Sequence, residues 1–165
     1  MRLTKNPRLV YVASSWRNAI RHSEVVRALQ DFGHSVYDFR NPPSGTSFSF
    51  HELSTAMETE RTYRGWNHDA SDSTDFRDII NHPMCKDGFN SDMQALMNAE
   101  VVVLVLPCER DAHLELGYAV GAGKETHILL DNPCKASLMY RMVDHLHDSL
   151  DDLKYSIGGP EVVAL

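Results

Sequence analysis

Six consecutive apolar residues, from Val101 to Leu106, constrain the fold of this chain more than any other feature of its sequence. A strand with alternating polar and apolar residues keeps one face in solvent, whereas an unbroken apolar run needs cover on both faces. Parallel sheets provide that cover, because the right-handed crossovers between parallel strands place helices on both sides. The run therefore predicts a central strand in a parallel sheet between two layers of helices.

The segments around this run repeat a rhythm of strand and helix. The ranges that we expect to be strands are 8–13, 35–39, 101–106, 126–130 and 144–148. The ranges that we expect to be helical are 19–32, 89–98, 114–123, 136–143 and a last segment that Ser149 caps together with Asp152. Gly33 is expected to end the first helix. The rhythm predicts an α/β fold, a flavodoxin-like or Rossmann-like doubly wound parallel sheet of about five strands with helices on both faces.

Residues 40–75 interrupt the rhythm with prolines, serines and scattered acids. A segment of this length without regular structure is uncommon in a compact domain unless it serves as a lid or a binding loop. We expect a helical turn within 51–61, and we expect Ser91 to cap the helix that ends before Glu100. The chain of 165 residues is long enough for one core, so we treat residues 1–165 as a single domain.

Composition narrows the classes of partner. The formal net charge of −7 leaves no basic stripe for extended nucleic-acid binding, and no run of about 18 apolar residues is present for a membrane span. The N-terminus carries no apolar signal segment, and the three cysteines form no CxxC pair, so we expect a cytoplasmic protein with reduced thiols. The chain also lacks the glycine-rich loops that bind ATP or NAD, and we expect no cofactor.

Ligands of doubly wound folds bind at the carboxyl ends of the strands. The first such loop contains Ser14, Ser15, Arg17 and Asn18, which offer hydroxyl groups, a guanidinium group and backbone N–H groups at the start of a helix. This set suits a small anion. The alternative is an ordinary capped helix start with a surface arginine.

Three further residues lie beside the expected carboxyl edge. Asp92 precedes the central strand, Glu115 lies in the first turn of the predicted helix after it, and Tyr11 lies in the first strand. Taken singly, Glu115 reads as a solvent-facing glutamate near a helix N-terminus, and Tyr11 as a core aromatic residue. Without a partner, a buried glutamate between Leu114 and Leu116 would be costly, which makes a functional role the alternative.

Cysteine and histidine residues suggest weaker alternatives. Cys108 follows the central strand, but the sequence identifies no partner histidine, and a small buried thiol is the simpler interpretation. His145 and His147 would share one face of an edge strand, a spacing that can bind a metal ion, but no third ligand is evident. We therefore predict no metal site.

Three motifs resemble those of the nucleoside 2-deoxyribosyltransferase family. They are YVASSW at residues 11–16, FNSDMQAL at 89–96 and HLELGYAVGAGK at 113–124. Their order and intervals are similar to the family pattern over residues 8–149, whereas residues 40–75 match it poorly. That family is in turn similar to the deoxynucleoside 5′-monophosphate N-glycosidases. The resemblance implies an enzyme that cleaves the N-glycosidic bond of a nucleoside or nucleoside 5′-monophosphate, by hydrolysis or by transfer of the sugar.

The resemblance also implies residue roles. Glu115 matches the nucleophile that forms a covalent glycosyl-enzyme ester, Tyr11 the residue that orients its carboxylate, and Asp92 the residue that handles the sugar or a proton at the base. The transferase has a base-contacting aspartate six residues before the nucleophile; Glu109 stands there in this chain, and Asp111 lies two residues nearer. His113 adjoins the site as a further ligand contact or as a surface histidine.

The resemblance to the monophosphate N-glycosidases concerns the phosphate group of the substrate. Ser15 and Arg17 resemble its phosphate loop, and Ser137 matches a serine that a neighbouring subunit donates to the phosphate. The resemblance therefore implies a homodimer or a larger homo-oligomer. The contrasting hypothesis is a protein that binds a nucleotide or nucleotide-sugar in the same pocket without turnover, as a sensor.

Overall fold

The computed structural model describes residues 7–43, 45, 47–49, 52–53, 55–56 and 73–158. The chain divides into two compact units. The first contains Met1–Asp38 and Ala95–Leu165, and the second contains Phe39–Gln94. The expectation of a single domain over residues 1–165 stays a prediction.

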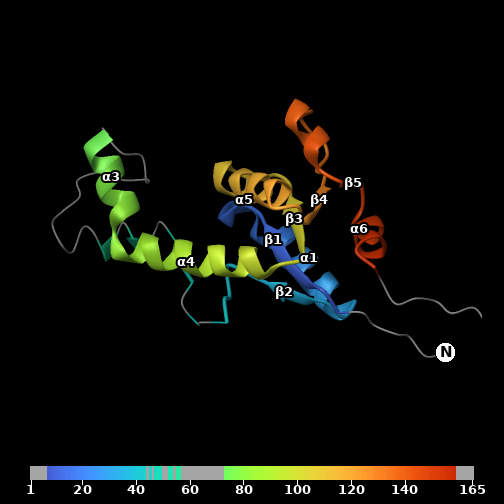
Figure 1. Cartoon of the computed structure of the whole chain (residues 1–165), viewed down its shortest axis with the longest axis horizontal. Helices are drawn as coiled ribbons and strands as arrows, with labels where there is room; N and C mark the ends of the chain where they lie inside the picture. Colours follow the sequence, from blue (N-terminus) through green and yellow to red (C-terminus); the bar gives the residue numbers. More distant parts are fainter. Residues whose placement is uncertain are drawn as a thin grey trace, which may run out of the picture. The chain divides into compact units, whose positions relative to one another are not determined.

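A five-stranded parallel sheet forms the centre of the first unit (Figure 1). The strands, in their order across the sheet, are β2 (Ser35–Tyr37), β1 (Leu9–Ala13), β3 (Val101–Val105), β4 (Glu125–Leu129) and β5 (His145–His147). All five residues of β3 are buried, as the apolar run predicts. The predicted α/β fold class is confirmed.

Helices cover both faces of this sheet. The helices α1 (Ala19–Asp31) and α6 (Leu150–Ser156) pack on one face, where Val10, Val12, Val103 and Leu129 join the core beneath them. The helix α5 (Arg110–Gly121) packs on β1, β3 and β4 from the opposite face, and Figure 1 shows α5 and α6 on either side of the strands. Because successive side chains of a strand point to opposite faces, each strand contributes to both layers.

Turn residues end the elements where the sequence indicates. Gly33 follows α1 with a φ of 106°, a left-handed conformation that favours glycine because it has no Cβ. Ser149 Oγ accepts a hydrogen bond from the backbone N–H of Asp152 at 3.1 Å and caps α6 as predicted. The carboxylate of Asp152, however, contacts His147 Nδ1 at 2.7 Å, so the expected reciprocal half of the capping box is replaced by a contact with β5.

Two helix boundaries correct the sequence analysis. The helix predicted at 114–123 begins at Arg110, so Glu115 lies in its second turn rather than its first. The predicted cap Ser91 lies inside α4 (Pro83–Asn98), which starts at a proline, a residue suited to the first position of a helix. The helical segment predicted at 136–143 is a 3-10 helix, η2 (Leu138–Met142).

The second unit contains α3 (Ser73–Asn81) and most of α4. Leu53 and Ile79 are buried in a small core of this unit, against Phe48, Met84 and Cys85. The helical turn expected within 51–61 falls largely outside the described residues. Among the residues that the structure describes, no helix has the length and apolar character needed to cross a membrane.

Candidate functional site

The loops after β1 and β3 are joined at the carboxyl edge of the sheet. Ser14 Oγ donates to the carbonyl oxygen of Val105 at 2.9 Å, and Asn18 Nδ2 donates to Ser14 Oγ at 3.3 Å and to the carbonyl oxygen of Pro107 at 3.1 Å. These bonds connect the ends of two neighbouring strands. Ser14 and Asn18, predicted as ligand contacts, therefore have a structural role in positioning the two loops.

The same loop presents Arg17 at the surface. Ser15 Oγ accepts a hydrogen bond from the backbone N–H of Arg17 at 3.2 Å and caps the 3-10 helix η1 (Trp16–Asn18). This arrangement is the capped helix start that the sequence analysis gave as the alternative to an anion site. The guanidinium group of Arg17 lies 3.5 Å from the carboxylate of Glu109, with the two side chains 80% and 60% exposed. Exposed pairs of this kind contribute only about 0–1 kcal/mol, so an anionic ligand can compete for Arg17.

Glu115 and Cys108 lie near each other at this edge. Glu115 is half-buried in the second turn of α5, and Cys108 is half-buried in the loop after β3. Burial, and then the negative charges of Glu115, Asp131 and Glu109, raise the pKa of the Cys108 thiol to about 12. The carboxylates of all three acids therefore lie close enough to Cys108 to act on its charge. A thiol held protonated in this way is a poor nucleophile.

Alkylation of Cys108 tests this electrostatic environment. Iodoacetamide at pH 8 should modify Cys108 in the folded protein at least about 100-fold more slowly than in the denatured chain, because only the thiolate reacts. Mass spectrometry of the tryptic peptides measures both rates. Since Glu115 is a cause of the raised pKa, Glu115→Gln should accelerate the reaction. Equal rates in folded and denatured protein would contradict the burial of the thiol and the placement of the three acids.

His113 is in contact with Cys108, a pairing that the sequence analysis did not find. Its Nδ1 lies 3.5 Å from Cys108 Sγ and 2.9 Å from the carbonyl oxygen of Glu109. Because a carbonyl oxygen only accepts, Nδ1 carries the proton, and Nε2 accepts from the hydroxyl group of Tyr140 at 2.9 Å. His113 therefore cannot take a proton from Cys108 through Nδ1, and the pair is not a thiol nucleophile with its base.

The side chain of Tyr140 in η2 contacts His113 near the start of α5. Its ring stacks on His113 with centroids 5.9 Å apart, and burial raises the pKa of its hydroxyl group. Ser137, at the N-cap position of η2, is exposed and makes no capping hydrogen bond. The sequence analysis missed Tyr140 because no local pattern indicates a contact across 27 positions of the chain. It also missed Asp131, which follows β4 in the last loop of this edge.

The remaining predicted residues occupy different surroundings. Tyr11 in β1 is fully buried and stacks on Tyr37 of β2 with ring centroids 5.3 Å apart, on the sheet face that α5 covers. Asp111 is exposed in the first turn of α5. Asp92 is half-buried in α4, within the second unit, and its position beside Tyr11 and Glu115 stays a prediction.

A separate group of side chains lies at the other end of β4. Within the described part of the chain, Glu125, His127 and His145 bring three donor atoms within 4.8 Å of one another, so that together they could hold a metal ion. Burial lowers the pKa of His127 to about 4, although the hydrogen bond that His127 makes to Glu125 acts in the opposite direction. The edge strand was expected to offer His145 and His147 without a third ligand; β4 supplies two more candidate ligands.

The fold is similar to that of a solved structure over most of both chains. A 2-deoxyribosyltransferase from the psychrotolerant bacterium Bacillus psychrosaccharolyticus superposes with a TM-score of 0.59 and 15% sequence identity, over 88% of this chain and 89% of that chain. No protein-family model and no curated protein matches the sequence. At this identity, the likeness establishes the arrangement of strands and helices.

Proposed function

We propose that this protein cleaves the N-glycosidic bond of a nucleoside or nucleoside 5′-monophosphate through a covalent intermediate on Glu115. The observation that carries the proposal is the position of Glu115: a half-buried carboxylate in the second turn of α5, beside the loop after β3 at the carboxyl edge of the sheet. The motifs around Tyr11, Asp92 and Glu115 and the shared fold with a 2-deoxyribosyltransferase support it.

The proposed reaction has two steps. A carboxylate oxygen of Glu115 forms a bond to the anomeric carbon C1′ while the bond from C1′ to the base nitrogen breaks, and a protein acid gives the departing base a proton. Asp92, Glu109 and Asp111 are the candidates for that acid. Water, or a second base, then attacks C1′, restores the Glu115 carboxylate and leaves its proton on a protein base. Two inversions at C1′ retain its configuration.

The phosphate preference rests on Arg17. Its side chain is 80% exposed, and Arg17 lies in η1, which directly follows the loop after β1 at the carboxyl edge of the sheet. A charge-assisted hydrogen bond to phosphate contributes about 1.5–3 kcal/mol, enough to favour a monophosphate by roughly 10- to 100-fold. Glu109, the present partner of Arg17, would then be released for contact with the base.

Base release from a panel of substrates tests the function. We would incubate the protein with ribo- and deoxyribonucleosides and their 5′-monophosphates, with and without a second free base, and quantify free base by chromatography. Release from monophosphates without an acceptor base is the expected result. Arg17→Ala should lower kcat/KM for monophosphates by about 10-fold or more and leave that for nucleosides nearly unchanged. Release only with an acceptor base would identify a transferase, and no release at all would favour the nucleotide sensor.

We also propose that two copies of the chain share this site through η2. Leu138 and Met139 of η2 are 79% and 58% exposed, and Leu114 and Tyr118 of α5 are 74% and 40% exposed. Leu138 and Met139 directly follow Ser137, the residue that the resemblance assigns to a neighbouring subunit. Sedimentation should give a dimer that Leu138→Glu dissociates, because a charge at an apolar interface is costly. A wild-type monomer at micromolar concentration would refute the shared site.

A further inference from the structure

The edge strand β5 and its neighbour β4 carry a row of acid and imidazole groups on the face below α6. Along β4, Glu125 and His127 alternate with the buried residues Thr126 and Ile128, and on β5 His145 is the register partner of His127. The rings of His127 and His145 stack with centroids 4.7 Å apart. The period of two along each strand, combined with this pairing, brings three potential ligands from two strands to one place.

The hydrogen bonds around His127 need one more N–H hydrogen than two neutral histidines carry. Its Nε2 lies 2.9 Å from Glu125 Oε1, and its Nδ1 lies 2.9 Å from His147 Nε2. His147 Nδ1 in turn lies 2.7 Å from Asp152 Oδ2. Two of these contacts end on carboxylates and the third joins two ring nitrogens, so the three contacts together need three N–H groups, whereas two neutral imidazoles supply two. A proton or a metal ion on one of the ring nitrogens would supply the missing positive group.

We propose that Glu125, His127 and His145 bind a divalent metal ion of the zinc class, with water in the remaining position. An ion on Nε2 of His127 replaces the missing hydrogen: Nδ1–H of His127 then donates to His147 Nε2, and Nδ1–H of His147 donates to Asp152. This is the outer-shell arrangement in which a ligating histidine gives its other N–H to a group held by a carboxylate. Two imidazoles and one carboxylate suit zinc better than magnesium or calcium, which prefer oxygen ligands.

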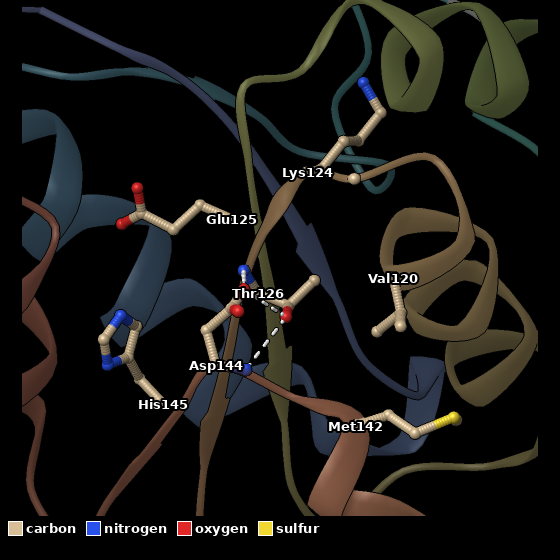
Figure 2. A pocket seen from close by; sticks show the side chains of 8 residues that line it. Val120, Lys124, Glu125, Thr126, Met142, Asp144 and His145 are labelled. Carbon is tan, nitrogen blue, oxygen red and sulfur yellow. Dashed lines mark hydrogen bonds between the residues drawn. The ribbon is translucent and has the colours of Figure 1, made fainter.

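The surroundings position the ligands for such an ion. Arg8 holds the second oxygen of Glu125 with an N···O distance of 2.8 Å, and His127 is fully buried. His145 is exposed, so its ring is free to turn toward the ion as the donor atoms close from 4.8 Å to the roughly 3.3 Å of a tetrahedral zinc site with bonds of about 2.0 Å. Figure 2 shows Glu125 and His145 on one side of β4, beside an open hollow that Lys124, Thr126 and Asp144 also line.

This site differs in position and purpose from the proposed glycosidic site. Glu125 begins β4, whereas Cys108, Glu109 and Asp131 follow the carboxyl ends of β3 and β4. The ion would join the edge strand β5, only three residues long, to β4 by bonds between side chains. We therefore expect it to stabilise the edge of the sheet, and its failure would leave the proposal for Glu115 untouched.

Zinc titration of the chelator-treated full chain tests this proposal. Calorimetry should give one Zn²⁺ per chain, and Zn²⁺ should raise the thermal unfolding midpoint. His145→Ala, a change at an exposed position, should weaken Zn²⁺ binding by about 100-fold or more and abolish the zinc-dependent rise in midpoint. Asp152→Asn should weaken binding by about 10-fold, because outer-shell changes cost 10- to 100-fold.

His113→Ala is the matched control, since it removes one exposed histidine elsewhere and should leave Zn²⁺ affinity unchanged. Co²⁺ substitution adds a spectroscopic measurement: visible absorption in the wild-type protein and in His113→Ala, with the bands lost in His145→Ala. The absence of stoichiometric Zn²⁺ binding in the wild-type protein would overturn the proposal, as would unchanged affinity in His145→Ala.

Discussion

Replacing Glu115 by glutamine should lower kcat for base release by at least about 1,000-fold while the affinity for the nucleotide changes little. Glutamine keeps the shape of the side chain but has no negative oxygen to form the ester with C1′, so the first step of the covalent route is lost. Binding contacts to the base and the phosphate lie on other residues and should persist. Chromatographic release assays and calorimetric titration of the same preparation measure the two quantities.

Two comparisons separate this result from misfolding. Glu24→Gln, which neutralises an exposed glutamate on α1, should retain full turnover, and both variants should keep the wild-type unfolding midpoint. Rapid quenching of the wild-type enzyme should also give intact protein whose mass has increased by one sugar residue from a nucleoside, or by one sugar phosphate from a monophosphate, and Glu115→Gln should lack that adduct. Turnover in Glu115→Gln within tenfold of wild type would reject the covalent mechanism, because no other oxygen replaces the nucleophile.

The central part of the fold could be predicted because its signals are local. The apolar run Val101 to Leu106 marks β3, and Gly33 marks the end of α1. The start of α5 was placed four residues late because its N-cap, Glu109, makes no side-chain capping bond and the residues after it, RDAH, show no apolar period. Asp87 and Gly88 resemble a turn, yet α4 continues through them, with Phe48 packed where a Cβ of residue 88 would lie.

The candidate sites were predicted less completely, because they depend on pairing between distant segments. The motif containing Glu115 can be read along the chain, but the contact of His113 with Tyr140 requires η2 to return to α5. The sequence analysis considered His145 and His147 as a pair without a third ligand, and the register of β4 against β5 instead brings Glu125 and His127 beside His145. A Glu-x-His pattern on one strand and a His-x-His pattern on the next are the signal to look for in such sequences.

Ile128→Ala should destabilise the protein by about 2–5 kcal/mol, the usual cost of removing a large aliphatic side chain from a packed core. Ile128 is fully buried in β4, on the sheet face that α5 covers, between its register partners Leu104 in β3 and Leu146 in β5. The surrounding strands and helix cannot collapse into the space without breaking their ladder hydrogen bonds. Denaturant titration followed by circular dichroism measures the loss.

Leu146→Ala provides the matched comparison for that change. Leu146 lies directly opposite Ile128 in the ladder but is 52% exposed, so truncating it removes much less buried apolar surface and should cost less than about 1 kcal/mol. The difference between two neighbouring truncations isolates burial from strand propensity and from the loss of a cross-strand pair. Equal costs for the two variants would mean that β5 is covered in solution, which is the result expected if a second chain packs on this edge of the sheet rather than through η2.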